Sequence, residues 1–234
     1  AVRSWQEHSG DQEPETESTD TALRVVGRSV PRADAPAKVT GRALYTEDIR
    51  FPDMLHGRLL TSPHAHARLT RLDIGPALAM NGVRAVLTQD DVQGKPTFGQ
   101  EEQDQPVLCD GTARYWGEPV AVVAADDEET ARRAAAAIVV EWEPLEPHTD
   151  PELAVKEGSS FREMRIRRGD EDAEGAVVVE GVYETATQDQ APLGPEAGFA
   201  IPDGEGGLDL YVTSQWVHVD HRQIIACRDM APHT

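Results

Sequence analysis

The sequence predicts a fold of the α+β class, and three observations lead to this prediction. Over residues 24–145, short strand patterns are interleaved with two short helical patterns, as in an α+β or α/β domain. Over residues 146–175 the composition changes to Pro, Glu, Asp, Arg and Gly, which indicates a linker between domains. Strand patterns return over residues 176–234, so we expect the first elements of a second domain there.

The overall composition limits the classes of function. The chain has 234 residues, 42 of them acidic and 22 basic, and a net charge of −20. This argues against binding to nucleic acid or to anionic membranes, because both need clustered Lys and Arg. The sequence has neither the ~20 consecutive apolar residues of a membrane helix nor the pattern of a signal peptide. Two cysteines, Cys109 and Cys227, are too few for a disulfide framework or a four-thiolate cluster. We therefore expect a soluble, cytoplasmic protein without an iron–sulfur cluster of its own.

Ordered structure is expected to begin near Val25. Residues 1–23 are rich in Glu, Asp, Ser, Thr and Gln. Such a stretch buries too little apolar surface to offset its ordering entropy, so we predict a disordered acidic tail. The pair Leu44-Tyr45 and the segment Leu55–Leu60 then show the short, turn-bounded apolar patterns of strands.

The remainder of the first domain gives clearer patterns. Pro76–Met80 is predicted to form a short helix, and Val83–Leu87 alternates like a half-buried strand. Pro119–Ala125 is a near-continuous run of small apolar residues, which is typical of a strand covered on both faces. Residues 126–129 supply an N-cap and an acidic first turn for a helix that ends at Ala137. A strand is expected directly after it, over Ile138–Trp142.

Beyond the first domain we expect fewer elements. A short Arg-rich strand is predicted at Met164–Arg167 within the linker, followed by strands over 177–184 and 208–214. The turn Gly204–Gly207 precedes the last of these and suits a hairpin. Residues 218–228 have the pattern of one amphipathic helix. Three elements provide little core, so we expect residues 176–234 to protect their amides poorly in the isolated chain.

Two segments contain residue types that can carry chemistry, and each has a structural alternative. His64 and His66 share one face of a strand and offer two metal ligands, but structural or surface histidines are favoured because no third ligand lies nearby. Glu118 can serve as a general base, but a carboxylate that caps backbone N–H groups is favoured.

The C-terminal segment contains three further candidates. Cys227 lies nine and six residues after His218 and His221, which are not helical neighbours of it, so a buried, unreactive thiol is favoured over a Cys/His pair. The Gly204–Gly207 segment is interrupted by an acidic residue, so a plain turn is favoured over a phosphate site. Gln215 ends a strand, where a neutral amide can contact a ligand, but spacing alone favours a strand-capping role.

Several blocks in a fixed order give the sequence a family resemblance, which covers residues 25–234. They are Lys38-Val39-Thr40-Gly41, Tyr45-Thr46-x-Asp48, Met54-Leu55-His56-Gly57, Ser62-Pro63-His64-Ala65-His66-Ala67, Gly117-Glu118-Pro119-Val120-Ala121-Val122-Val123-Ala124, Val140-Glu141-Trp142-Glu143-Pro144-Leu145 and Ile166-Arg167-Arg168-Gly169-Asp170. Together they resemble the molybdopterin-binding large subunit of the xanthine dehydrogenase and aldehyde oxidase family. The resemblance implies an α/β hammerhead domain followed by the first elements of a molybdenum-cofactor-binding domain, truncated in this chain.

The same resemblance implies a function and a site residue. The segment Gln188–Glu196 is most similar to the molybdopterin-binding subunit of the bacterial, purine-oxidising xanthine dehydrogenases. Gln215 matches the family's glutamine beside an oxo ligand of molybdenum, which implies a catalytic and cofactor-binding role. We therefore expect part of an enzyme that hydroxylates purines with water as the oxygen source.

The resemblance also implies what lies outside this chain. The family's glycine-rich loop, its further pterin-binding segments and its catalytic glutamate are absent here, so the isolated chain is expected to be inactive. The implied partners are the remainder of the molybdenum subunit, an iron–sulfur subunit and an FAD subunit. Two alternatives remain: a related aldehyde, carbon monoxide or N-heterocycle hydroxylase, and a non-catalytic module that binds a partner through its hammerhead domain.

Overall fold

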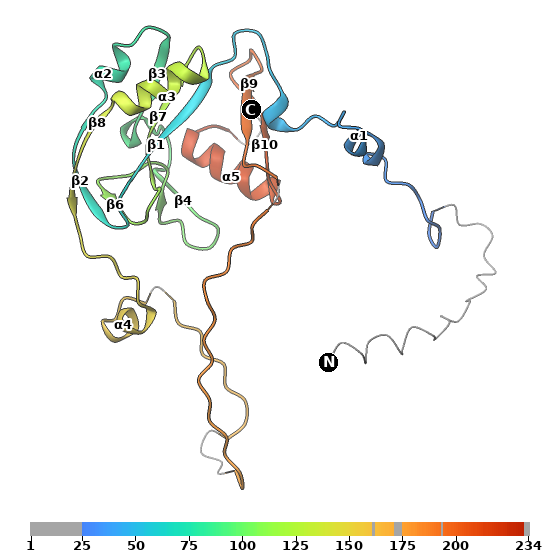
Figure 1. The fold of residues 1–234 in the computed structure, drawn as a ribbon, viewed down its shortest axis with the longest axis vertical. Coiled ribbons are helices and arrows are strands. Elements are labelled where there is room, and N and C mark those ends of the chain that lie inside the picture. The colour runs from blue at the N-terminus through green and yellow to red at the C-terminus, as the bar shows by residue number, and fades with distance from the viewer. Residues whose placement is uncertain (1–24, 161, 171–174, 193, 232–234) are drawn as a thin grey trace. The chain divides into compact units, whose positions relative to one another are not determined.

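A computed structural model describes residues 25–160, 162–170, 175–192 and 194–231 (Figure 1). The chain divides into two compact units, residues 1–45 and residues 46–234. The described part of the first unit contains one short helix, α1 (Ala35–Val39), with a proline in its first turn. The strand predicted at Leu44-Tyr45 is wrong: both residues are exposed and irregular, because no described strand pairs with them. The tail predicted over residues 1–23 lies outside the described residues.

The second unit contains an antiparallel sheet of three strands in the order β1 (His56–Thr61), β7 (Pro119–Ala125), β3 (Val83–Leu87). A 3₁₀ turn, η1 (Thr46–Asp48), precedes it. The central strand β7 carries most of the buried side chains, as its run of small apolar residues predicts. The three strand predictions for this sheet are therefore confirmed, to within one residue at each end.

Two helices pack on this sheet. Helix α3 (Glu128–Ala137) begins at its N-cap Asp127, as predicted, and α2 (Gly75–Leu78) is one turn long. The buried residues of α3 are alanines, whose small side chains let the helix lie close to β1 and β7. The main core comprises Ala77, Val86, Ala121, Val123, Ala134, Ala135 and Ile138.

A second three-stranded sheet has the order β6 (Thr112–Ala113), β2 (Ala67–Asp73), β8 (Val139–Pro144). The strand predicted at Ile138–Trp142 corresponds to β8, whereas β2 was not predicted. Its sequence, Ala-Arg-Leu-Thr-Arg-Leu-Asp, mixes charged and apolar residues, and its pairing with β8 contains an irregularity between Leu69 and Arg71. A 3₁₀ turn η2 (Gln89–Asp91) and a two-residue pair, β4 (Thr97–Phe98) with β5 (Gln105–Pro106), complete this region.

The segment that follows β8 differs most from the sequence predictions. It contains the short helix α4 (Pro151–Lys156), capped by Asp150, within the stretch expected to be a linker. The linker itself stays a prediction. The strands predicted at Met164–Arg167 and at 177–184 are wrong, because the described residues there form no strand. Val182 and Tyr183 are 99 % and 94 % exposed. β-branched residues favour a strand only where a partner supplies hydrogen bonds and a packing surface, and no described strand does so here.

The last strand and the last helix form as the sequence predicts, whereas the strand that precedes them was not predicted. Strand β9 (Gly198–Pro202) pairs with β10 (Leu208–Val212) in an antiparallel hairpin, and the turn between them contains Gly204–Gly207. The Asp203 carboxylate stabilises this turn by accepting hydrogen bonds from two backbone N–H groups within it. Helix α5 (Val217–Arg228) follows and is terminated by Asp229 in the left-handed conformation. No helix in the described ranges is long and apolar enough to cross a membrane.

Candidate functional site

Gln215 lies at an exposed bend between β10 and α5. The residues before it are held to the hairpin: Thr213 N donates to Ala197 O at 3.0 Å, and Thr213 Oγ1 donates to Pro195 O at 3.1 Å. Directly before it, Ser214 Oγ accepts a hydrogen bond at 3.0 Å from the backbone N–H of Trp216, the residue that precedes α5. The backbone on both sides of Gln215 is therefore fixed while its side chain faces solvent.

The chemistry of this bend is that of a neutral hydrogen-bonding group. A carboxamide donates two N–H groups and accepts through its oxygen without adding charge. The hydroxyl of Ser214, which bonds the Asp220 carboxylate, is already occupied by local contacts. Gln215 is thus the side chain of this bend that can turn toward a bound group.

The other end of α5 is held by residues 94–99, which comprise the end of the loop after η2, strand β4 and Gly99. Gly94 N donates to Cys227 O at 2.9 Å, and Lys95 N donates to Ala226 O at 2.8 Å. Gly99 N donates to the side-chain oxygen of Gln223 at 3.0 Å. We call residues 94–99 and these three bonds the α5 clasp. Figure 1 shows α5 beside β4, which is part of the clasp.

An apolar pocket of about 610 Å³ lies between α5 and the β3–β7 edge of the first sheet. Residues of both regions line it, including Leu87, Leu108, Val122, Ile224 and Cys227. Val212, Thr213 and Asp220 beside the bend also line this pocket, but Gln215 itself does not.

The thiols in this region are poor nucleophiles. Cys227 is half-buried, with Sγ 4.0 Å from Thr97 O, and Cys109 is buried. Burial raises the pKa of both thiols above the ordinary value of 9.0, which lowers their thiolate fraction. His218 and His221 are exposed on α5. The sequence favoured a buried thiol at Cys227, whereas the structure leaves it half-buried; its lack of reactivity stays a prediction.

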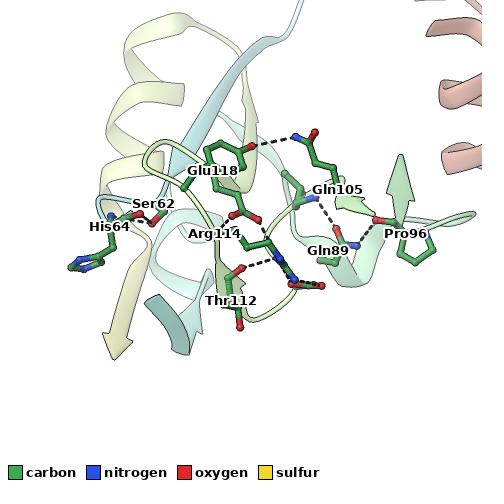
Figure 2. A network of polar contacts seen from close by, with 11 residues as sticks. Ser62, His64, Gln89, Pro96, Gln105, Thr112, Arg114 and Glu118 are labelled. Carbon is green, nitrogen blue, oxygen red and sulfur yellow. Dashed lines mark hydrogen bonds and ion pairs between the residues drawn. The ribbon is translucent and has the colours of Figure 1, made fainter. Parts of the chain in front are cut away.

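Glu118 caps backbone groups, as the sequence favoured. Figure 2 shows its carboxylate beside Arg114: Oε2 accepts from Arg114 N at 2.5 Å, and Oε1 lies 3.4 Å from Arg114 Nη1. The same guanidinium bonds the Asp110 carboxylate at 2.9 Å. The Glu118 side chain is only 2 % exposed. Because it is engaged and enclosed, it is not placed to act as a general base on a substrate.

Gln89 joins two segments of the chain in a way that the sequence did not predict. Its side-chain oxygen accepts from Leu108 N at 2.7 Å, and its amide nitrogen donates to Pro96 O at 2.8 Å (Figure 2). Pro96 lies within the α5 clasp, and Leu108 is buried. Gln89 thus connects the clasp to the core. The local sequence gives no signal for contacts over such separations.

The two histidines of the Ser62–Ala67 segment contact other parts of the chain. His66 Nδ1 lies 2.8 Å from Glu146 O, and the His64 ring packs edge-on against Trp142 at 5.9 Å. Among the residues that the structure describes, no group of three or more His, Cys, Asp or Glu side chains is gathered for a metal ion. The structure thus gives both histidines structural contacts and adds no third ligand to them.

Comparison with known proteins gives matches over most of the chain. The family model of the aldehyde oxidase and xanthine dehydrogenase a/b hammerhead domain matches residues 40–146, and that of the molybdopterin cofactor-binding domain matches residues 155–234. A probable xanthine dehydrogenase subunit of Bacillus subtilis is 36 % identical over 85 % of this chain and 28 % of its own length. The nicotinate dehydrogenase large molybdopterin subunit of Eubacterium barkeri is 34 % identical over 86 % of this chain and 50 % of its own length.

A solved structure is also similar. The aldehyde oxidoreductase of Desulfovibrio gigas superposes with a TM-score of 0.77 at 27 % identity, over 87 % of this chain and 25 % of its own. The chain therefore spans between a quarter and a half of the length of these three proteins.

Proposed function

The chain belongs to the aldehyde oxidase and xanthine dehydrogenase family, and we propose that it is part of a molybdenum hydroxylase large subunit that oxidises purines. The proposed reaction hydroxylates a substrate such as hypoxanthine or xanthine, with water as the source of oxygen. The observation that carries the proposal is the match of residues 155–234 to the molybdopterin cofactor-binding domain, with Gln215 exposed at a fixed bend inside that range.

The residues of the bend fit a contact with the molybdenum cofactor. Gln215 offers an N–H donor that adds no charge, and an oxo ligand is a hydrogen-bond acceptor. We propose that Gln215 donates to the cofactor and holds its orientation toward the substrate. When bound, the cofactor supplies the oxygen-transfer and two-electron chemistry that no side chain can perform. The contribution of this chain is then binding and orientation.

The proposed preference for purines rests on two observations of sequence similarity. It comes from Gln188–Glu196, which is similar to the purine-oxidising group, and from the 36 % identity to a protein named as a xanthine dehydrogenase subunit. A specific observation favours a second candidate, an N-heterocycle hydroxylase. The nicotinate dehydrogenase subunit is nearly as similar, at 34 % identity, and the match covers more of its length. Aldehydes and carbon monoxide are the remaining substrates within this proposal.

The proposed partners follow from the electron path. Oxidation of the substrate releases two electrons, which need acceptors. The described residues hold no cluster of cysteines, and the whole sequence contains only Cys109 and Cys227. We propose that the electrons pass to iron–sulfur clusters and then to FAD on partner subunits, and that the assembly works in the cytoplasm.

The proposal is tested on the native assembly, purified through this polypeptide. Elemental analysis is expected to give about one molybdenum per chain, as one cofactor-binding domain requires. The assembly is then assayed with hypoxanthine, xanthine, nicotinate and an aliphatic aldehyde, with an artificial electron acceptor. Turnover in ¹⁸O-labelled water is expected to place the label in the product.

Each result separates the alternatives. Turnover of both purines, with slower oxidation of nicotinate and aldehyde, supports the purine hydroxylase. Turnover of nicotinate alone supports the second candidate. An assembly without molybdenum contradicts both and supports a non-catalytic module that binds a partner through its hammerhead domain.

A further inference from the structure

The α5 clasp connects the hammerhead region to the helix that begins directly after Gln215. Helix α5 starts at Val217, two residues beyond Gln215, and the clasp holds its last two turns. A helix of this length is a stiff rod with a rise of about 1.5 Å per residue, so a shift at one end is transmitted to the other. The position of the Gln215 bend therefore depends on the contact between α5 and the clasp, which belongs to the hammerhead region.

Gly94 makes this contact possible because it has no side chain. A Cβ at this position would lie 2.1 Å from Ala226 O and 2.7 Å from Asp229 N. Both atoms are backbone atoms at the end of α5, so neither can rotate away. Gly94 does not have a positive φ angle, so the obstacle that the structure shows to a side chain here is the collision with the end of α5.

Gln223 adds a side-chain bond from the same helix. Its oxygen accepts from Gly99 N, in a partly buried position. Gln89 in turn bonds Pro96 of the clasp and Leu108 of the core. Hydrogen bonds thus connect the core to α5 through the clasp. On the side of the core, Gln89 bonds Leu108 and Pro96. On the side of the helix, the clasp bonds Gln223, Ala226 and Cys227.

We propose that Gly94 and Gln223 are positioning residues for Gln215, which they hold at its cofactor by fixing α5 against the hammerhead domain. This inference rests on the proposed function, because it presupposes that Gln215 contacts the cofactor. It assigns the hammerhead domain a role in setting the site, in addition to any contact with partner subunits.

The test uses the complete molybdenum enzyme with two variants that disturb the clasp differently. Gly94→Ala pushes on the end of α5, and Gln223→Leu removes the acceptor of Gly99 N while keeping a side chain of similar size. Both are expected to keep their molybdenum and to lose turnover per molybdenum by roughly tenfold to a hundredfold, as a misplaced orienting group does. The electron paramagnetic resonance spectrum of Mo(V) is expected to change in both.

Three further variants provide the controls. Gly57→Ala adds the same methyl group where nothing lies within 4 Å, and His221→Leu changes an exposed residue of the same helix. Neither is expected to alter the spectrum. Gln223→Glu keeps an oxygen acceptor for Gly99 N, so it is expected to recover most of the lost turnover and the wild-type spectrum.

The outcomes are decisive in each direction. Unchanged turnover per molybdenum and an unchanged Mo(V) spectrum in Gly94→Ala and Gln223→Leu overturn the proposal. The proposal is also overturned if both variants lose molybdenum or fail to fold while the control variants keep their molybdenum. The clasp would then be needed for assembly of the enzyme and not for orientation of Gln215. An absence of molybdenum from the wild-type enzyme is a different result: it contradicts the proposed function, and this inference falls with it.

Discussion

At the scale of single residues, Glu118 shows how burial decides between two interpretations of one carboxylate. Its side chain is almost fully enclosed and bonds the backbone N–H and the guanidinium of Arg114. Its own backbone carbonyl accepts from Ser62 N at 2.8 Å. The residue therefore joins β1 to the loop before β7, which is a structural function.

Replacing Glu118 by leucine is expected to lower the free energy of unfolding of the chain by about 1–3 kcal/mol, because Arg114 N loses its acceptor in a partly buried position. Glu118→Gln keeps one acceptor and is expected to lose less. Urea denaturation followed by circular dichroism measures both. A leucine variant as stable as the wild type would contradict this account.

An exposed ion pair provides the comparison for Glu118. Glu129 and Arg132 lie on the outer face of α3 with side chains 60 % and 58 % exposed. Water screens such a pair, so Glu129→Leu is expected to change stability much less than Glu118→Leu. Equal losses in the two variants would mean that charge, and not burial, sets the effect.

At the scale of elements, α3 depends on the size of three alanines. Ala134 is fully buried against the sheet, whereas Ala136 lies on the exposed face of the same helix. Ala134→Leu forces extra methyl groups into a filled space and is expected to cost about 1–3 kcal/mol of unfolding free energy. Ala136→Leu changes the helix propensity by the same amount as Ala134→Leu, but its side chain points to solvent. It is therefore expected to leave the free energy of unfolding nearly unchanged. Thermal or urea unfolding of the two variants checks the difference.

The N-cap of α3 gives a pH dependence with a defined sign. Asp127 accepts from Thr130 N at 2.8 Å and from its hydroxyl at 2.7 Å, and these bonds lower the pKa of Asp127 below 3.8. Because the folded-state pKa is lowered, the stabilisation is present above the ordinary pKa and is lost as the pH falls through the folded-state pKa.

Asp127→Ala is therefore expected to be less stable than the wild type at neutral pH, with a difference that shrinks below about pH 4. Asp127→Asn also caps a helix but does not titrate, so its stability relative to alanine is expected to vary little with pH at this position. Denaturation at several pH values measures both comparisons. A difference between wild type and Asp127→Ala that grows at low pH would contradict the assignment.

The same scale shows what could be predicted from the sequence. Pro119–Ala125 and the helix capped by Asp127 carry local patterns strong enough to locate them. The segment 177–184 has an equally strong strand composition, yet its described residues pair with nothing. A segment forms a strand only where a second strand lies beside it, and the composition of the segment does not say whether such a strand exists. The α5 clasp escaped prediction for a related reason, because Gly99 and Gln223 are 124 residues apart and meet only in the folded chain.

At the scale of the whole molecule, residues 46–234 form one compact unit that includes the hairpin β9–β10 and α5. The clasp and the edge-on contact of Phe51 with Phe199, at 5.5 Å, tie these elements to the first sheet's region. The expectation that residues 176–234 protect their amides poorly stays a prediction. Among the described residues, those before β9 are exposed and pair with no strand, whereas β9, β10 and α5 are held by hydrogen bonds.

Hydrogen exchange of the isolated chain tests this division. Residues 175–192 are exposed and belong to no strand. Their backbone amides are therefore expected to exchange at nearly unprotected rates. The paired amides of β9 and β10 and those in the last turns of α5 are expected to exchange more slowly, and those of β7 slowest of all, since β7 lies between two strands. Gly94→Ala is expected to speed exchange in α5 while leaving β7 unchanged. Equal, rapid exchange across 176–231 in the wild type would show that the clasp does not hold α5 in this chain, and that the hammerhead region alone provides its stable structure.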